Sequence, residues 1–350
     1  MDRDRIWEFI ERVTGFAAGF TTIGLLALAD RVGILATLAG AGQLTAAVVA
    51  ERAGADPRYT REILSGLAVA GVLDYDPNDA TFALPNEHAA VVADDTSPYS
   101  MAGYLDMLPA MASHLPALTD AAEHGGGVPF SDFGDRAVAG IDRANSPGMR
   151  ILLTRRWLAA MPDVLERLET GGRVADVGSG SGTAALAMAA AYPNTEIVGI
   201  DVDEESVRRA RERQGDLPNV TFVVGDAASI LLTESGFDLI TAFDVVHDLA
   251  DPLATLRAAR AALGADGVLF MMEPNVAPEL EDNLGSDRAA LVYGMSTMFC
   301  MTQSLAQGGA GLGAAWGPRQ AEELVREAGF GGFEVLPIDN PFSAFYRITA

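Results

Sequence analysis

Apolar and polar positions in the second half of the chain follow a pattern that predicts strands alternating with helices. Short, mainly apolar runs are separated by longer segments of helical composition, such as the Ala-rich run that begins at residue 183. Strands buried on both faces and joined by helical crossovers are typical of a parallel sheet. We therefore predict an α/β fold, a Rossmann-like sheet with helices on both faces. The five runs lie within residues 174–182, 195–203, 219–229, 237–251 and 267–275.

The segment after the fifth run predicts an insertion and then the end of the sheet. Residues 276–316 are too many for a plain crossover and include a Met-rich helical stretch followed by GGAGLG. An insertion at the carboxyl ends of parallel strands faces the ligand crevice, so we expect a lid there. Ordinary core packing is the alternative for its Met and aromatic residues. Residues 321–330 predict an amphipathic helix, and GFEVLPID with FSAFYRITA predicts a closing antiparallel hairpin.

The first 95 residues predict a mainly α-helical winged-helix domain. Two short helical stretches, LTAAVVAERAG and RYTREILSGLAVAG, flank the turn ADP and are followed by VLDYDPNDATFAL, which has turn-forming residues at its centre. Further helices, interrupted by the loop HGGGVPFSDFG, are predicted before the sheet begins. We expect a winged-helix domain at 1–95, a helical linker and pocket region at 96–168, and the sheet domain at 169–350 with its insertion 276–316.

Residues 13–29 carry no charge, which superficially suggests a signal peptide or a membrane span. The preceding segment contains acids as well as Arg, so the basic region that precedes a signal peptide is missing. Seventeen mixed residues are also short for a span. We expect a buried helix with no membrane partner, and we predict that Phe16, Phe20 and Leu25 lie between the subunits of a homodimer.

The net negative charge of the chain argues against a nucleic-acid partner. The 350 residues carry a net charge of −24, and all 24 basic residues are Arg. Residues 1–95 contain fourteen acids against seven Arg, and the expected wing holds Asp74, Asp76 and Asp79 where DNA phosphates would lie. We therefore expect no nucleic-acid partner. Cys300 is the single cysteine, which forbids an internal disulfide and suits a reducing cytoplasm.

The first apolar run ends in a Gly-rich turn, VADVGSGSG, that is typical of nucleotide binding. Glycine lets the backbone lie close to a ligand, and here the turn leads directly into a helix start. Asp176 precedes Gly178 and Gly180, and the position where a dinucleotide fingerprint has its third Gly is occupied by Thr183. An acid beside helix-start amides suits a ligand that carries both charges, as the methionine end of S-adenosylmethionine does.

Acids at the ends of the next runs predict the rest of a cofactor site. Asp201 follows Gly182 by nineteen residues, where a second strand presents an acid to ribose hydroxyls. Asp226 ends the third run, placed to accept from the adenine amino group. The expected cofactor-binding residues are Asp176, Gly178, Gly180, Asp201, Val202, Asp226, Ala227, which leaves room for the ring, and Phe243, which packs nearby.

These motifs, taken in order, resemble the class I S-adenosylmethionine-dependent methyltransferases over residues 170–350. With the winged helix added, the chain is similar to small-molecule O-methyltransferases, in which that domain dimerises and helps to wall the acceptor pocket. It also resembles a bacterial group of two-domain methyltransferases of unassigned substrate over almost its whole length. That second resemblance rests on VLDYDPNDATFALP, HGGGVPFSDFG and YGMSTMFCMTQSLAQGGAGLG.

His247 is the candidate general base for a hydroxyl acceptor, because the turn after the fourth strand should hold it near the methyl group. Glu273 ends the next strand, where its carboxylate can bond the far imidazole nitrogen and fix the tautomer. The plant-type O-methyltransferases have a similar His-Asp pair and acid, but Leu249 stands where that family usually has Trp. The alternative is that His247 only packs or caps a helix. The other histidines lack ligand spacing, so we expect no metal.

The sequence thus predicts a cytoplasmic, dimeric methyltransferase that uses S-adenosylmethionine and acts on a small apolar or aromatic molecule, most simply at oxygen. Methylation at carbon or nitrogen needs the same cofactor site but not His247. A transcriptional regulator that senses the cofactor is the alternative from another class. Thr183 disfavours an NAD-dependent oxidoreductase.

Overall fold

The computed structural model describes residues 1–350, which form two compact units. The first unit comprises Met1–Ser113 with Gly134–Pro147, and the second comprises His114–Phe133 with Gly148–Ala350. The helix α8 (Gly134–Ile151) contributes to both units. The expected domain limits at residues 95 and 168 remain predictions.

The first unit contains the predicted winged helix. Thr45 and Asp56 cap the helices α3 and α4 with their side chains, which is why each begins where it does. Three short antiparallel strands follow the order β1-β3-β2 and form the wing. The elements are α1 (Arg3–Arg31), α2 (Ile34–Leu38), β1 (Leu44–Thr45), α3 (Ala46–Ala53), α4 (Pro57–Val69), β2 (Asp74–Asp76), β3 (Thr81–Ala83), α5 (Asn86–Val92) and α6 (Gly103–Ser113).

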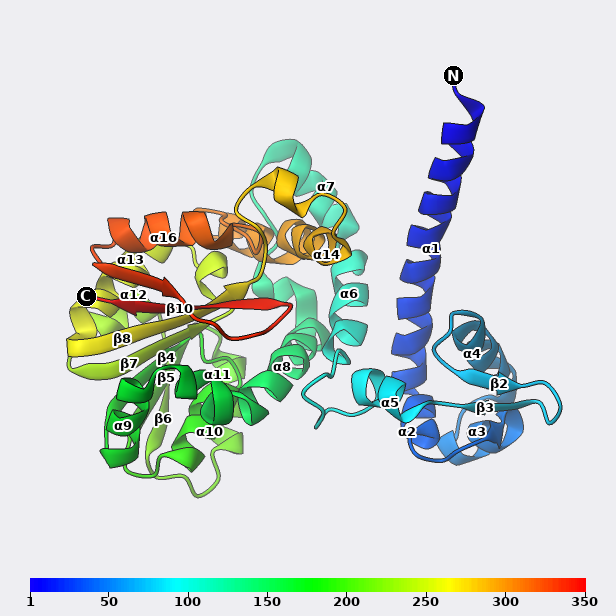
Figure 1. Ribbon diagram of the computed structural model, residues 1–350, viewed down its shortest axis with the longest axis horizontal. Helices are drawn as coiled ribbons and strands as arrows, with labels where there is room; N and C mark the ends of the chain where they lie inside the picture. Colours follow the sequence, from blue (N-terminus) through cyan, green and yellow to red (C-terminus); the bar gives the residue numbers. More distant parts are fainter. The chain divides into compact units, whose positions relative to one another are not determined.

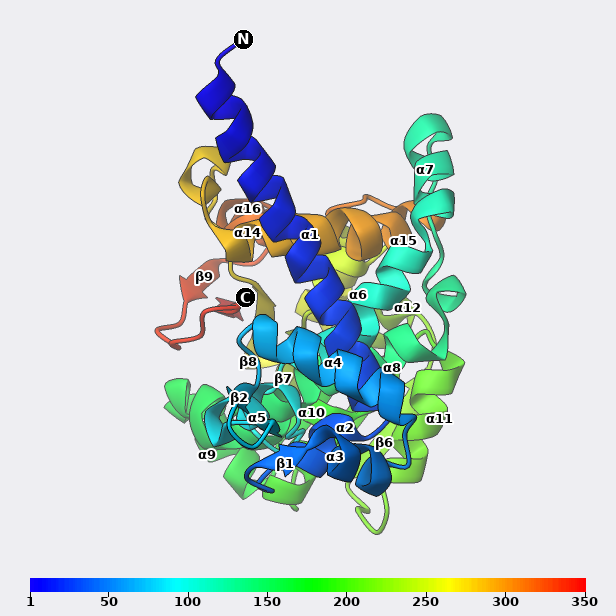
Figure 2. The same ribbon diagram turned by 90° about the vertical axis from the view of Figure 1, so that its right-hand side faces the viewer.

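Helix α1 is much longer than the other helices of its unit, and its N-terminal part extends beyond them (Figure 2). Its buried residues lie only near its end, at Leu26, Ala27 and Ala29. Phe16 and Phe20 are 65% and 67% exposed. By length and composition α1 could cross a membrane, and 17% of its apolar window is buried within the chain. Most of α1 is therefore uncovered within one chain, and its burial between subunits remains a prediction.

Close backbone packing and ion pairs hold α6 to the first part of α8. A Cβ on Gly103 would lie 2.3 Å from the backbone carbonyl oxygen of Gly140, so the two helices can approach only because no side chain intervenes. Arg143 on α8 donates to Asp30 at 2.6 Å and to Asp95 at 2.7 Å. The acidic first unit thus places a cation between its own carboxylates, which reduces their mutual repulsion.

The second unit contains the predicted sheet, with strands in the order β6-β5-β4-β7-β8-β10-β9. Its elements begin with α7 (Leu115–His124), the 3₁₀ helix η1 (Phe130–Phe133), the π helix η2 (Leu153–Trp157), the 3₁₀ helix η3 (Leu158–Ala160) and α9 (Pro162–Thr170). They continue with β4 (Arg173–Val177), α10 (Thr183–Ala191), β5 (Glu196–Asp201), α11 (Glu204–Arg213), β6 (Val220–Val224), α12 (Ala227–Leu231), β7 (Phe237–Phe243), the 3₁₀ helix η4 (Val246–Asp248), α13 (Pro252–Ala262) and β8 (Leu263–Pro274). They end with the 3₁₀ helix η5 (Leu280–Asn283), α14 (Asp287–Met295), the π helix η6 (Ser296–Cys300), α15 (Met301–Ala306), α16 (Gly317–Glu327), β9 (Gly332–Val335) and β10 (Ser343–Thr349).

The sheet confirms the predicted Rossmann-like architecture. Strands β4 to β8 pair in parallel, and β10 pairs antiparallel with both β8 and β9 as the closing hairpin. One hydrophobic cluster joins α9, α10 and α11 to the sheet, and a second joins α12, α13 and α16 to its other face (Figure 1). Both faces are therefore covered, which explains why the strands are nearly all apolar.

The strand order reverses between β4 and β7, so the loops that follow these two strands meet at the topological switch point. Ligands of open α/β sheets bind at this point, outside the carboxyl ends of the strands. The insertion at 276–316 is helical, as predicted, and contains α14, η6 and α15. Its role as a lid remains a prediction.

Asp176 is a buried acid in the middle of this sheet. Its Oδ1 accepts a hydrogen bond of 2.6 Å from the hydroxyl of Thr241 on the neighbouring strand β7. Burial raises its pKa to about 7, because the interior disfavours the charged carboxylate; the hydrogen bond opposes the shift, and the charge of Asp201 adds to it. In the folded chain Asp176 therefore keeps its proton at pH values where an exposed aspartate has lost it.

We predict that Asp176→Asn reduces the pH dependence of stability. The folded pKa lies above the unfolded one, so the contribution of Asp176 is fully present below about pH 4 and is lost as pH rises through about 7. Without cofactor, the melting temperature of the wild type should fall relative to that of Asp176→Asn between pH 4 and 8. A melting-temperature difference that is constant over this range would contradict the assignment. The exposed Asp216→Asn is the matched control.

Candidate active site

The loop that follows β4 is built on glycines with left-handed backbone conformations. Gly178, Gly180 and Gly182 have φ values of 66°, 52° and 83°, which residues with a side chain rarely adopt. A Cβ on Gly178 would lie 2.3 Å from the side chain of Val245, so this loop packs directly against the loop that follows β7. The amide of Gly178 donates to the carbonyl of Ile200 at 2.8 Å. The glycine loop is thus fixed at the switch point and leads into helix α10.

Asp201 ends β5 beside the glycine loop. Its Oδ2 accepts from the amide of Gly180 at 2.8 Å, and its Oδ1 accepts from the amide of Asp203 at 2.8 Å. Burial raises its pKa, while these amide hydrogen bonds oppose the shift. Each carboxylate oxygen retains a lone pair, so the group can still accept from a hydroxyl of a ligand. The next residue, Val202, is 68% exposed.

Asp226 follows β6 and begins helix α12. Its carboxylate accepts from the amide and the hydroxyl of Ser229 at 2.8 and 2.7 Å, so it acts as an N-cap in this structure. Ala227 is buried, and the amide of Gly225 donates to the carbonyl of Asp201 at 2.8 Å. The three predicted cofactor acids thus belong to adjacent strands, but Asp176 lies within β4, Asp201 is the last residue of β5, and Asp226 follows β6 and already caps a helix.

The chain turns sharply at the end of β7. Phe243 is buried and packs edge-to-face against Phe270, with ring centroids 5.2 Å apart. Asp244 has a φ of 56°, uncommon for a residue other than glycine, and its amide donates to the carbonyl of Met272 at 2.8 Å. This turn places the 3₁₀ helix η4, with His247, beside the end of β8.

His247 and Glu273 are brought together as the sequence predicted. Nδ1 of His247 contacts Oε2 of Glu273, and both side chains are buried. The same carboxylate accepts from the amide of Val246 at 3.0 Å and from the indole Nε1 of Trp316 at 3.1 Å. Since Nδ1 is engaged by the carboxylate, Nε2 is the nitrogen left to face a ligand.

The electrostatics of this pair favour a charged imidazole when the site holds no other cation. Burial alone lowers the pKa of His247, but the charges of Glu273 and Asp248 outweigh it, and the net pKa lies well above the ordinary value. Burial also raises the pKa of Asp248 to about 6 and that of the Cys300 thiol to about 12. A positively charged cofactor beside the pair would favour the neutral imidazole, because like charges repel.

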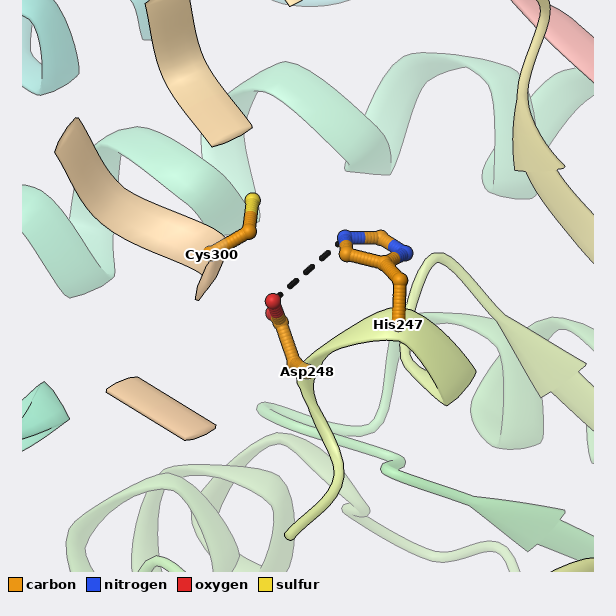
Figure 3. Close-up of side chains that lie close together, drawn as sticks. All are labelled: His247, Asp248 and Cys300. Atoms are coloured by element: carbon orange, nitrogen blue, oxygen red, sulfur yellow. Dashed lines mark ion pairs between the residues drawn. The ribbon is translucent and has the colours of Figure 1, made fainter. Parts of the chain in front are cut away.

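Sequence reasoning missed Trp316 and Cys300 as neighbours of this pair. Both lie within the insertion 276–316: Trp316 is 43 residues after Glu273 (316 − 273), and Cys300 is 53 residues after His247 (300 − 247). No spacing rule links residues this far apart. The cluster formed by His247, Asp248 and Cys300 is shown in Figure 3.

Two family models match the chain in the places where the two folds are seen. Residues 168–329 match a methyltransferase domain, and residues 21–94 match the Rv2258c-like winged HTH domain. The first match covers the glycine loop, Asp201, Asp226, His247 and Glu273. The predicted fold and the suspected family are therefore confirmed.

Relatives and solved structures agree with these matches. An uncharacterised 37.1 kDa protein in transposon Tn4556 of Streptomyces fradiae is 31% identical over 54% of this chain and 51% of its own. The 27-O-demethylrifamycin SV methyltransferase of Amycolatopsis mediterranei is 30% identical over 36% of this chain and 46% of its own length. The chain therefore spans about half the length of the curated relatives that it matches.

The human N-acetylserotonin methyltransferase, solved with S-adenosylmethionine, has a TM-score of 0.69 at 21% identity and covers 100% of this chain and 98% of its own. At this identity the likeness shows a shared fold. Together, the sheet, the glycine loop and the family matches show that the chain carries a methyltransferase domain at residues 168–329 and an N-terminal winged-helix domain at residues 21–94, with a fold shared with an S-adenosylmethionine-binding methyltransferase.

Proposed function

We propose that the protein transfers a methyl group from S-adenosylmethionine to a hydroxyl of a small apolar or aromatic molecule. The observation that carries this proposal is the buried pair of His247 and Glu273 on a turn that packs against the glycine loop through Val245 and Gly178. The contact between Val245 and Gly178 therefore holds the proposed base next to the proposed cofactor loop. Methylation of a hydroxyl usually needs such a base close to the methyl donor.

The cofactor would lie along the carboxyl ends of the parallel strands. The proposed contacts are the ribose with Asp201, the adenine with Asp226 beside Ala227 and Val202, and the methionine end with the glycine loop. For Asp226 the ligand would share a carboxylate that already caps α12. For Asp176 the structure supports mainly a bracing role, since its carboxyl is buried and bonded to Thr241. Phe243, at the end of β7, would pack against the cofactor.

The chemistry follows from the geometry of the pair. S-adenosylmethionine supplies a methyl group on a sulfonium, which leaves as a neutral thioether when the acceptor oxygen forms its bond to carbon. Nε2 of His247 accepts the hydroxyl proton, while Nδ1 stays bonded to Glu273, which stabilises the imidazolium formed. Val246 and Trp316 hold the carboxylate through two further hydrogen bonds. Glu273, held by Val246 and Trp316, thus positions His247 and balances the positive charge of its imidazolium.

An apolar acceptor suits the surroundings of the pair. Phe299, next to Cys300, is buried and packs edge-to-face against Phe133, with ring centroids 4.7 Å apart. The related 27-O-demethylrifamycin SV methyltransferase and N-acetylserotonin methyltransferase are named for small organic acceptors. We propose that the insertion 276–316 forms the acceptor lid and that residues 96–168 contribute to the pocket. A panel of hydroxylated aromatics with radiolabelled S-adenosylmethionine tests this, and no product from any member would count against it.

We also propose a cytoplasmic homodimer without a nucleic-acid or membrane partner. The exposed apolar side chains of α1 need a cover, and a second copy of α1 offers a matching apolar surface. Exposed acids on the wing, such as Asp74, oppose docking to DNA, which argues against the cofactor-sensing regulator. A gel shift should therefore show no salt-sensitive DNA binding. Cys300 is a free thiol, in keeping with a reducing compartment.

We predict that Asp201→Ala weakens binding of S-adenosylhomocysteine by on the order of 1 to 3 kcal/mol, because ribose hydroxyls would lose their acceptor. Isothermal titration calorimetry measures the effect. Asp216→Ala, which removes an exposed acid of the same unit, should leave the affinity unchanged. If the two variants bind equally well, Asp201 does not belong to the site.

We predict that His247→Gln lowers turnover by roughly a hundredfold or more on an acceptor found in the panel, while cofactor affinity stays the same. Glu273→Gln should act in the same direction, and the double variant should be little worse than His247→Gln because the two side chains act as one unit. His88→Gln, an exposed histidine of the first unit, is the control. Turnover of His247→Gln at the wild-type rate would indicate methylation of a carbon or a basic nitrogen instead.

We predict a particle of twice 36.7 kDa by light scattering at micromolar concentration. Replacing Phe16 and Phe20 together by Ser should yield a monomer, since both side chains are about two-thirds exposed in the single chain. Val335→Ser, which changes an exposed apolar residue of the second unit, should leave the dimer intact. A monomeric wild type would overturn the proposal and leave the apolar surface of α1 for another partner.

A further inference from the structure

We propose that His247, Asp248 and Cys300 form a site for a zinc ion. Figure 3 shows the three side chains lying close together, two on the 3₁₀ helix η4 and one on the π helix η6. One ligand atom from each residue, an imidazole nitrogen, a carboxylate oxygen and the thiol sulfur, lies within 4.8 Å of the other two. Imidazole, carboxylate and thiolate are the three donor types that zinc takes from proteins.

The spacing fits a tetrahedral ion after a small adjustment. Nε2 of His247 and Oδ1 of Asp248 are 3.4 Å apart. Bonds of about 2.0 to 2.3 Å to a tetrahedral zinc place its ligand atoms about 3.3 to 3.8 Å from each other. The histidine and the aspartate are therefore already at ligand spacing, and a ligand atom of Cys300 lies within 4.8 Å of theirs. A fourth position stays open, as in zinc sites that exchange ligands.

The groups behind the histidine also match those of metal sites. A histidine that binds a metal usually donates its other ring nitrogen to a carboxylate, which fixes the ring and its tautomer. Glu273 takes this position at Nδ1 of His247, and Trp316 and Val246 hold Glu273 in turn. The free nitrogen is therefore aimed at Asp248 and Cys300 by three hydrogen bonds to one carboxylate.

Asp248 supplies an independent observation that points to a cation. Its Oδ1 is shielded from solvent and makes no hydrogen bond, and it forms only an ion pair of 3.4 Å with Nε2 of His247. A shielded carboxylate oxygen without a hydrogen bond is poorly stabilised, and a metal ion would bind it directly. The side chain as a whole is 27% exposed, whereas that of His247 is 2% exposed. Asp248 therefore offers the route by which an ion enters a cluster that is otherwise buried.

Zinc at this site would compete with the proposed base, and this consequence rests on the proposed function. Coordination uses the lone pair of Nε2 that would otherwise accept the hydroxyl proton. The Cys300 thiol would lose its proton to solvent and bind as the thiolate. Zinc should therefore inhibit methyl transfer reversibly, while the cofactor loop at Gly178 and Asp201 is left free.

The test measures metal binding by the full-length protein without acceptor. After chelation and dialysis, the chain should take up about one equivalent of Zn²⁺ by elemental analysis, and Co²⁺ in its place should give a thiolate-to-metal charge-transfer band. Cys300→Ala should lose this band and weaken zinc binding by roughly a hundredfold. Asp248→Asn should weaken binding in the same direction. Unchanged affinity of Cys300→Ala for S-adenosylhomocysteine shows that the variant is folded.

Two results would overturn the inference: substoichiometric zinc on the wild type, or equal zinc affinity of the wild type and Cys300→Ala. Neither result depends on methyl transfer, so the proposed function would stand. Conversely, if His247→Gln turns over at the wild-type rate, His247 is not the base. That result would not change the amount of zinc expected on the wild-type protein. With an acceptor in hand, micromolar Zn²⁺ should inhibit the wild type, a chelator should restore it, and Cys300→Ala should resist.

Discussion

The carboxylate of Glu273 is the interaction on which the site depends. It is buried at the end of β8, and a buried charge without partners would cost several kcal/mol. Three donors from different parts of the second unit satisfy it: the imidazole of His247, the amide of Val246 and the indole of Trp316. These three hydrogen bonds connect the turn after β7 and the start of α16 to the end of β8 through the carboxylate of Glu273. The position of the imidazole is a result of this requirement.

Much of the fold could be predicted because its signals are local. Apolar runs of strand length, glycines before a helix and the hairpin at the end of the chain determine the order of the elements without reference to distant contacts. The sheet confirms each of them, including the antiparallel β10. The pairing of His247 with Glu273 was also predictable, because parallel neighbours bring their carboxyl ends to the same edge. Topology alone supplies that contact.

What could not be predicted depends on side chains that meet across long separations or on solvent exposure. Cys300 reaches His247 only through the path of the insertion, which no periodicity specifies. Asp176 was expected at the ligand, but the register of β4 and β7 places it opposite Thr241 inside the sheet. Helix α1 has the composition of a buried helix and is largely exposed in a single chain, because composition does not say which molecule covers an apolar face.

The π helix at Ser296–Cys300 links the geometry of the insertion to a simple change in chain length. A π helix holds one residue more than the α-helix it interrupts, and one residue of an α-helix corresponds to about 100° of rotation. Deleting a single residue there would restore a continuous α-helix and turn the side chains on one side of it away from their present directions. Cys300 would leave His247 while the sheet and the glycine loop stayed as they are. The chain could therefore gain or lose this neighbour of its histidine by insertion or deletion of one codon, without any substitution at the crevice.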